Sequence, residues 1–287
     1  MFETILNIIK NILSSLTIIK NKIEKISKKR QKLLEDLDYP FKVTGNMVQR
    51  CGDEMSLKDK IILEIGPGNF LINGLIYLSH GARKVYLIDK YKHLFWDQHD
   101  IAFHKIIIDK IARSNMPYSR EALKAIIFEE NAVKFDREKI IFKQEDVKHL
   151  SLESDSIDII FSNAVLEHVP RLKEAVDEMR RVLKPGGIGV HEIDLRDHFS
   201  NDNPLKLLSY PDWLWIMMTS NRPGFTNRLR FTDYIDLFNK AHFTIEKHYI
   251  QLEYEGDLSE IKINKKFQKY SADNLKILTF WIKTVKH

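Results

Sequence analysis

From residue 60 onward, short apolar runs alternate with helical segments, and this alternation limits the possible folds more than any other feature of the sequence. The first run, 61–65, is followed by a Gly-Pro-Gly turn and by a helical segment with Leu71, Leu75 and Leu78 on one face. A second apolar run, 84–88, follows that helix. Strands that alternate with helices form βαβ units and parallel sheets. The sequence therefore predicts an α/β protein with a Rossmann-like, doubly wound sheet.

The turn after the first predicted strand is suited to ligand binding. Glycine at 66 and 68 lets a ligand approach the backbone closely, and the next helix offers free N–H groups at its N-terminus. Asp89 ends the second strand, where an acidic residue can accept hydrogen bonds from ribose hydroxyls. Leu71 stands at the place of the third glycine of a dinucleotide loop, which disfavours NAD. Glu64 puts a negative charge beside the turn, which suits a cationic ligand.

Four motifs in order resemble those of the class I S-adenosylmethionine-dependent methyltransferases, in particular the type 11 methyltransferases. The first is Glu64-Ile65-Gly66-Pro67-Gly68, an acidic residue followed by the glycine pair, and the others lie at residues 143–147, 155–168 and 179–187. Segments 244–250 and 275–283 look like the final hairpin of that family. The resemblance implies a seven-stranded sheet, methyl transfer and S-adenosylmethionine as the cofactor.

The resemblance also implies where the cofactor binds. It carries the family's adenine-binding position over to Asp146. At the third small position of the turn this chain has Asn69, which is acceptable because Asn adopts left-handed backbone angles nearly as readily as Gly. The cofactor-binding residues expected on these grounds are Glu64, Gly66, Pro67, Gly68, Asn69, Asp89, Lys90, Asp146, Val147 and Asn163.

A dense polar cluster follows the fifth predicted strand, 187–190. Residues 191–198 include two histidines, three carboxylates and an arginine. Active sites of open α/β sheets lie beyond the carboxyl ends of the strands, so the cluster predicts an acid–base site. His198 or His191 is the expected general base, with Asp194 or Asp197 orienting it, since imidazole titrates near the working pH. The spacing fits no standard metal motif, so no metal is expected.

The insertion at 196–230 is the expected acceptor side of the site. It combines aromatic side chains with amide and guanidinium groups suited to phosphate or carboxylate recognition; buried arginines paired with the acidic body are the alternative. His168 either contacts the acceptor or orders the turn after the fourth strand. The substrate-binding residues expected are His168, Arg196, Trp213, Arg228 and Arg230.

The acceptor itself is suggested by a weaker resemblance. Residues 191–199 and 227–230 look like the corresponding parts of methyltransferases of bacterial glycan and glycoconjugate assembly. This implies O-methylation of a sugar hydroxyl on a glycan or activated sugar. The alternatives are a small-molecule methyltransferase of specialised metabolism and an inactive cofactor-binding scaffold.

The N-terminal residues form a separate unit in this interpretation. Residues 1–45 are expected to be an amphipathic helical extension of a methyltransferase domain, 46–287, with helical insertions near 91–138 and 196–230. Its apolar positions recur at steps of four and three, as on one face of a helix: Ile5, Ile9, Ile12, Leu16, Ile19, Ile23 and Ile26. Packing on the protein's own body, on a second copy, or on an anionic membrane all remain open. No stretch is apolar enough to predict a transmembrane span.

The charge is divided among three parts of the chain. The net charge is +5, with +6 on residues 1–32 and +6 on 261–287, so residues 33–260 carry −7. An acidic body with basic ends is a poor match to a nucleic-acid-binding protein, and no nucleic acid is expected. Cys51 is the only cysteine, and no cleavable signal is recognised. A cytoplasmic protein is therefore expected, with peripheral attachment to the inner face of the cytoplasmic membrane left open.

Overall fold

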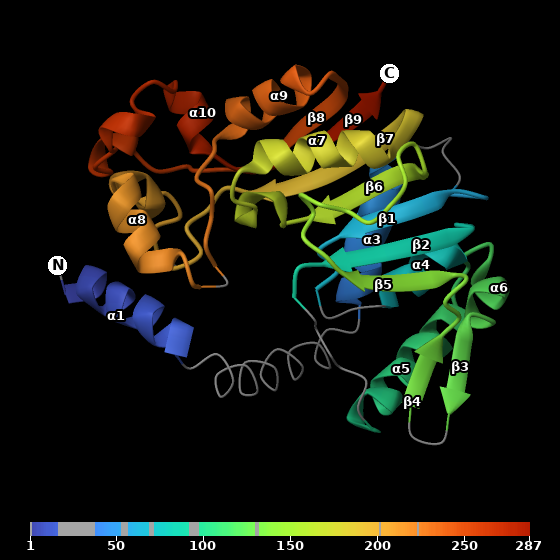
Figure 1. Cartoon of the computed structure of the whole chain (residues 1–287). Coiled ribbons are helices and arrows are strands. Elements are labelled where there is room, and N and C mark those ends of the chain that lie inside the picture. Colours follow the sequence, from blue (N-terminus) through green and yellow to red (C-terminus); the bar gives the residue numbers. More distant parts are fainter. Residues whose placement is uncertain are drawn as a thin grey trace.

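The computed structural model describes residues 2–16, 38–52, 57–68, 72–91, 98–129, 132–200, 202–222 and 224–287. Its centre is a seven-stranded sheet with the order β5-β2-β1-β6-β7-β9-β8 (Figure 1). The strands of this sheet are β1 (Ile61–Ile65), β2 (Lys84–Asp89), β5 (Ile140–Gln144), β6 (Ile157–Asn163), β7 (Leu183–Asp194), β8 (Phe243–Glu253) and β9 (Ile277–Lys286).

The sheet is mostly parallel. Strands β5, β2, β1, β6 and β7 run parallel to their neighbours, whereas β9 is antiparallel to both β7 and β8. In this register Glu64 lies opposite Phe161, and Asn163 lies opposite Glu192. The carboxyl ends of the parallel strands therefore share one edge of the sheet. This arrangement confirms the predicted Rossmann-like α/β fold with seven strands.

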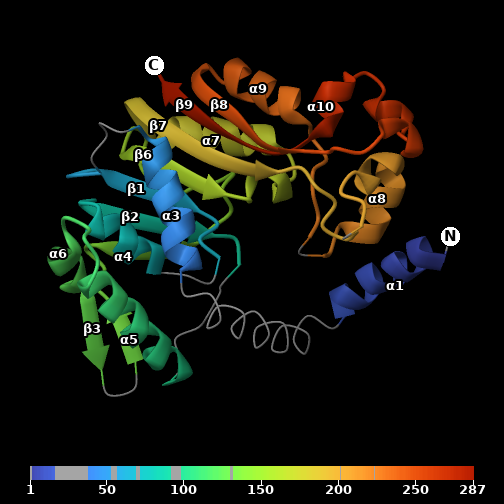
Figure 2. The same ribbon diagram turned by 180° about the vertical axis from the view of Figure 1, so that it is seen from behind.

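Helices cover both faces of the sheet. One face packs on α3 (Tyr39–Arg50) and α4 (Ile72–Ser79), and the other packs on α7 (Leu172–Val182) and α9 (Phe231–Lys240) (Figure 2). Successive side chains of a strand point to opposite faces, so each strand supplies both cores. In β1, for example, Ile62 enters the core under α4 whereas Leu63 and Ile65 enter the core under α7.

The insertion expected to be helical at 91–138 has mixed structure. It contains α5 (Gln98–Ala112) and α6 (Ser119–Leu123), followed by a hairpin of β3 (Ile126–Glu129) and β4 (Ala132–Phe135). Ile, Val and Phe dominate the hairpin sequence, and these residues favour strands. Residues 92–97 of this insertion lie outside the described residues.

A third, smaller core lies beyond the carboxyl edge of the sheet. It combines α8 (Asp212–Thr219) with α10 (Ala272–Lys276) and three 3₁₀ turns: η2 (Lys206–Ser209), η3 (Leu258–Glu260) and η4 (Lys265–Phe267). Leu208, Trp215, Met218 and Phe267 are buried in it. The expected insertion at 196–230 is therefore part of a small subdomain that the C-terminal segment completes.

The N-terminal helix α1 (Phe2–Leu16) packs on α8 (Figure 1). The contacting side chains are Asn7, Ile8 and Asn11, not the predicted apolar seam. Ile5, Ile9 and Ile12 are exposed instead, because polar hydrogen bonds fix the other face of the helix to the body. The rest of the seam, Ile19, Ile23 and Ile26, lies outside the described residues.

The helix α3 bears on where the N-terminal extension ends. The proposed boundary after residue 45 falls inside α3, so the methyltransferase core begins at Tyr39 at the latest. Among the helices of the described residues, none is long and apolar enough to cross a membrane.

Candidate active site

The turn after β1 requires glycine at its first position. Gly66 has φ +70°, and its N–H donates to the Ile88 carbonyl at 2.8 Å. A Cβ on Gly66 would lie 2.4 Å from Cγ2 of Val165, so a side chain would collide with the segment that follows β6. Gly68 also has a positive φ, +66°, but the space beside it is open. Pro67 between them is buried, and Asn69 lies outside the described residues.

Glu64 is a buried carboxyl group directly beneath this turn. Asn73 of α4 donates a hydrogen bond to its Oε1 at 2.8 Å. Its Oε2 is buried and has no hydrogen-bond partner among the described residues. Burial raises the pKa of Glu64 to about 8, because desolvation outweighs the hydrogen bond from Asn73. An unpaired buried carboxyl oxygen at this place suits a cationic group supplied by a ligand.

The next two strands contribute acidic residues to the same edge. Asp89 ends β2 and accepts a hydrogen bond from the Tyr91 N–H at 2.9 Å. Asp146, just after β5, lies 3.5 Å from the Lys90 ammonium and 3.4 Å from that of Lys148. Burial favours a higher pKa for Asp146, but the Lys148 N–H and the two ammonium groups together lower it. Asp146 is therefore held ionised.

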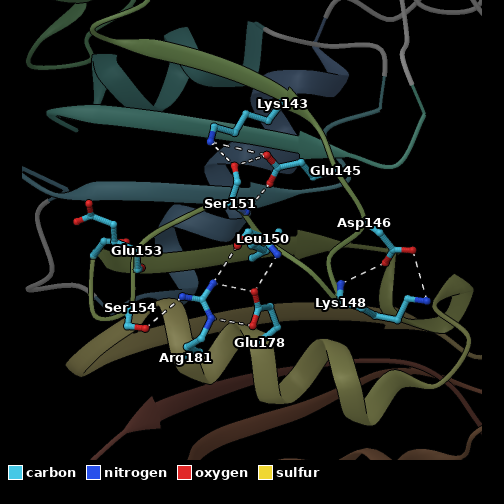
Figure 3. A network of polar contacts seen from close by, with 11 residues as sticks. Lys143, Glu145, Asp146, Lys148, Leu150, Ser151, Glu153, Ser154, Glu178 and Arg181 are labelled. Atoms are coloured by element: carbon cyan, nitrogen blue, oxygen red, sulfur yellow. Dashed lines mark hydrogen bonds and ion pairs between the residues drawn. The ribbon is translucent and has the colours of Figure 1, made fainter.

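A polar network anchors the loop that carries Asp146 (Figure 3). Arg181 of α7 donates to the Leu150 carbonyl at 2.9 Å and pairs with Glu178, which accepts from the Leu150 N–H at 2.8 Å. Nearer to β5, the Ser151 N–H donates to Glu145 at 2.9 Å. These contacts fix the backbone at Asp146, while Val147 next to it is buried.

These residues fit the S-adenosylmethionine that the sequence motifs imply. The cofactor carries a positive charge, and Glu64 has a buried oxygen available for a cationic group. The open side of Gly68 admits a ligand close to the backbone. Asp89 ends β2, at the position expected for a ribose contact. Asn163, at the end of β6, lies next to Glu192 of β7, so β6 adds a polar group to the same edge.

The segment after β6 carries two ionisable residues side by side. Glu167 and His168 lie in the 3₁₀ turn η1 (Leu166–His168). Glu167 is buried, and neither of its carboxyl oxygens has a hydrogen-bond partner among the described residues. Burial, together with the nearby Asp194 and Glu192, raises its pKa well above the usual value, although its own backbone N–H opposes the shift. Burial thus favours the protonated form of Glu167.

His168 is held in one orientation. Its Nδ1 lies 2.5 Å from the Phe225 carbonyl oxygen, so Nδ1 carries the proton that it donates. Burial lowers the pKa of His168 despite this hydrogen bond, and the imidazole is neutral. Its ring meets that of His198 edge to face, with centroids 5.0 Å apart. The structure therefore brings together two of the histidines predicted from the sequence.

His198 pairs with Asp194 and not with Asp197. Nε2 of His198 is 3.5 Å from Oδ2 of Asp194, an ion-pair distance longer than a good hydrogen bond. Arg196 donates to both oxygens of Asp194, at 2.7 to 3.1 Å. Burial opposes ionisation of Asp194, but His198 and Arg196 lower its pKa far below the usual range. Asp197 instead accepts from the Phe199 N–H at 2.7 Å and shapes the turn.

His191 lies in the core, away from the polar edge. The sequence interpretation ended the fifth strand at 190, whereas β7 continues to Asp194 because β9 pairs with it that far. Alternation along this longer strand turns His191 inward, where it is 1% exposed, stacks on Phe238 and hydrogen-bonds Ser162 at 2.8 Å. Burial lowers its pKa to about 3. The structure gives His191 a packing role in place of the catalytic one expected.

The two arginines expected to bind substrate are buried and bonded to the protein itself. Arg228 donates to the carbonyls of Leu207 and Tyr210 and pairs with Asp212. Arg230 is fully buried at the start of α9, and its guanidinium donates to carbonyls in three segments: Leu195, Leu275 and Ile277. Burial lowers the pKa of Arg230 to about 10. Both residues hold the small subdomain to the sheet.

Trp213 and Arg196 have different surroundings. Trp213 lies on α8 and is 63% exposed, so it contacts solvent and does not line the polar edge. Arg196 remains at the edge through its pairing with Asp194. Of the expected acceptor residues, the structure therefore places His168 and Arg196 beside His198.

Sequence reasoning assigned no role to Glu167 or Arg50 at this edge, and it counted Glu192 only as one carboxylate of the polar cluster at 191–198. Arg50 of α3 forms an ion pair with Glu192 at the end of β7 and lies over the ring of Trp281. Glu167 could have been singled out from the sequence, because it is a carboxylate that follows an apolar stretch and precedes His168. No local pattern pointed to Arg50, because its partner lies on a strand that is far away in sequence. Within the described part of the chain, no group of three or more His, Cys, Asp or Glu side chains is arranged to hold a metal ion.

Comparison with known proteins agrees with this geometry. A family model described as "Methyltransferase domain" matches residues 116–190. A sterol 24-C-methyltransferase of Aspergillus fumigatus is 36% identical over 67 residues, which are 23% of this chain and 18% of that protein. An arsenite methyltransferase of Halobacterium salinarum is 34% identical over 58 residues, which are 20% of this chain and 15% of that protein. The matched part thus spans less than a fifth of these curated relatives.

A solved structure matches over nearly the whole chain. It is the methyltransferase in a complex with the Haloferax volcanii Trm112 methyltransferase activator, with a TM-score of 0.51 and 11% identity over 94% of this chain and 98% of that chain. At this identity the likeness shows the fold. The methyltransferase-domain match over residues 116–190, this fold and the edge that fits the cofactor agree with one another, and together they support a class I S-adenosylmethionine-dependent methyltransferase.

Proposed function

We propose that this protein transfers a methyl group from S-adenosylmethionine to a hydroxyl group, with His198 as the general base. The observation that carries the proposal is the pairing of His198 with an ionised Asp194 at the carboxyl edge of the sheet. A hydroxyl is a poor nucleophile until its proton is removed, and a positioned imidazole performs this step in many enzymes.

The residues of the cofactor side have binding roles. Glu64 is available to a cationic group of the cofactor, Asp89 to its ribose and Asp146 to its adenine, while Gly66 and Gly68 shape the turn. When bound, S-adenosylmethionine supplies an electrophilic methyl group on a sulfonium. The protein must then align the acceptor oxygen with that methyl group and exclude water.

The residues of the acceptor side handle one proton. Nε2 of His198 faces Asp194 at 3.5 Å, which leaves Nδ1 of His198 to take the proton of the acceptor hydroxyl. Asp194 then stabilises the imidazolium, and Arg196 keeps Asp194 ionised and in place. His168, neutral and fixed by the Phe225 carbonyl, offers Nε2 as a second polar contact.

A sugar hydroxyl on a glycan or activated sugar is the acceptor that we propose. The imidazole of His168 and the carboxyl group of Asp194 lie beside the base, and Glu167 lies next to His168; such groups exchange hydrogen bonds with neighbouring hydroxyls. The same groups would be left unpaired against an apolar acceptor, which is costly when they are buried. This polarity favours a sugar over the sterol named for one relative.

The experiment compares His198→Asn with the surface control His248→Asn in a methyl-transfer assay with labelled cofactor. We expect His198→Asn to lower kcat by about a hundredfold or more while the cofactor Kd stays unchanged. His248 is an exposed residue on β8, and its variant should behave like the wild type. A His198→Asn enzyme with normal kcat would exclude His198 as the base and direct attention to His168.

The acceptor is tested by offering carbohydrate, lipid and small-molecule fractions in parallel. Label in carbohydrate products supports the proposal. Label only in amines, aromatic hydroxyls or other small molecules would replace the sugar acceptor with a small-molecule one. Tight cofactor binding without transfer to any fraction would favour a non-catalytic scaffold.

A further inference from the structure

The outer surface of α1 and α8 is unusually apolar. We define the apolar surface as Ile5, Ile9, Trp213, Ile216 and Met217, whose side chains are 46% to 63% exposed. Large exposed apolar side chains gathered on neighbouring elements mark interaction sites more often than single exposed ones do. Figure 1 and Figure 2 both show the two helices side by side at the end of the molecule remote from the β3–β4 hairpin.

Specific hydrogen bonds hold the two helices together. Nδ2 of Asn11 donates to the Met217 carbonyl at 2.9 Å, and its Oδ1 accepts from the Asn221 N–H at 2.8 Å. Arg222 donates to Oδ1 of Asn7 at 3.1 Å. These contacts use the polar face of α1, so its apolar face stays outside. The surface is therefore a built feature of the fold: Asn7, Asn11 and Ile8 face α8, whereas Ile5 and Ile9 face outward.

Charge indicates what this surface meets. Residues 17–32 follow α1 directly and contain seven Lys or Arg against one Glu. Two copies of the chain that met through α1 would bring these like charges together, which opposes a dimer. A bilayer with anionic headgroups attracts them instead, and an apolar helix face flanked by Lys residues is typical of helices that lie in a membrane interface. Trp213 fits this setting, because Trp is enriched at headgroup level.

We propose that the apolar surface of α1 and α8 docks the enzyme on an anionic lipid bilayer, with residues 17–32 supplying the electrostatic attraction. The docked helices are connected to the active site. Arg222 stacks over Phe199 at 3.9 Å, and the Phe225 carbonyl accepts from His168. Docking therefore brings the polar site near the lipid headgroups, which favours a lipid-linked acceptor; this last step rests on the proposed function.

The test is flotation of the full chain with vesicles of phosphatidylcholine alone or mixed with phosphatidylglycerol. We expect binding to the mixed vesicles, with a blue shift of Trp fluorescence that Trp213→Phe reduces. The variant Ile9→Gln/Ile216→Gln should lower the partition coefficient at least about tenfold. Its matched control is Ile127→Gln, which changes a side chain 47% exposed on β3 and should leave partition unchanged.

A charge variant separates the two contributions. Lys25→Gln/Lys28→Gln/Lys29→Gln should weaken binding to mixed vesicles and have no effect with phosphatidylcholine alone. Circular dichroism and cofactor binding show whether each variant is folded. If Ile9→Gln/Ile216→Gln is not folded, Trp213→Ser replaces it. The cofactor Kd also keeps this test separate from methyl transfer, since vesicle binding needs no turnover.

Two results would overturn the proposal. One is equal recovery of the wild type and the double variant with mixed vesicles. The other is a dimer, seen by analytical ultracentrifugation, that Ile9→Gln/Ile216→Gln converts to monomer, because the surface would then belong to a second copy.

Discussion

The glycine turn on the cofactor side and the buried arginines of the small subdomain on the acceptor side treat their buried polar groups in opposite ways. On the cofactor side, Glu64 at the turn after β1 has a buried carboxyl oxygen that has no hydrogen-bond partner among the described residues. On the acceptor side, Arg228 and Arg230 direct their buried guanidinium groups to carbonyls of their own chain. A buried polar group that is hydrogen-bonded within the protein supports the fold, whereas a buried polar group without such a partner is available to a ligand.

This difference gives a criterion for sorting polar residues near a site. Arg228 and Arg230 have a charge that suits phosphate, but the fold already uses most of their donors. Glu64 and Glu167 are costly to bury in their ionised form, and burial raises the pKa of both. Perturbed carboxyl groups at the edge of a sheet are candidates for function for that reason.

Arg230→Met should produce the largest loss of stability. The substitution leaves the carbonyls of Leu195, Leu275 and Ile277 without their donors in a dry environment, so the free energy of unfolding should fall by about 4 kcal/mol. Urea denaturation measures this change. In the control Arg196→Met, the lost ion pair is partly exposed, and the expected loss is below about 1 kcal/mol.

Arg230→Met would break the comparison if it kept its stability and lost only turnover. The guanidinium would then contact the acceptor, as the sequence interpretation expected. An enzyme that unfolds earlier but has normal kcat at low temperature supports the structural role.

The fold, and the gathering of the expected cofactor residues at one edge of the sheet, could be predicted from sequence because their signals are local. The strand, the turn at Gly66 and Gly68 and the acidic end of β2 lie within one βαβ unit, where neighbours in sequence are neighbours in space. Asp146 was placed by a short motif directly after β5. Asn69 and Leu71 have no structural outcome, since both lie outside the described residues.

The acceptor side depends on partners that are remote in sequence. Arg230 bonds to carbonyls up to 47 residues away, and no local pattern shows that these carbonyls lack donors. His191 points inward because β7 continues to Asp194, where β9 still pairs with it. The sequence around residue 190 does not show this pairing, so the predicted strand ended too early. The same reason explains the N-terminal helix, whose contact face was decided by hydrogen bonds to α8 and not by its own apolar period.

Gly66→Ala should impair cofactor binding more than folding. The new Cβ meets Val165 in a backbone conformation, φ +70°, that Ala adopts at a cost. We expect the Kd for S-adenosylmethionine to rise by at least about tenfold, measured by calorimetry, because the turn must shift. Gly186→Ala is the control, since Gly186 has φ +76° and open space but lies away from the site.

The same clash offers a second variant that sharpens the result. In Gly66→Ala/Val165→Ala, the second substitution removes both γ-methyl groups of Val165 that the new Cβ would meet. Part of the cofactor affinity should therefore return. If the Kd of Gly66→Ala equals that of Gly186→Ala, close approach at Gly66 is not needed for binding, and the cofactor side would be as self-contained as the acceptor side.

Glu64→Gln should change how stability depends on pH. In the folded protein the pKa of Glu64 is raised to about 8 from 4.5, so the unfolded chain releases this proton first and stability falls as pH rises between these values. Between pH 6 and 7.5, the wild type should lose about 2 kcal/mol relative to Glu64→Gln, measured by urea denaturation without cofactor. Saturating S-adenosylmethionine should reduce this loss in the wild type, because its positive charge favours the ionised carboxylate. A wild type and variant with parallel stability curves would mean that Glu64 already has an internal partner, and the distinction between the two sides of the molecule would fail.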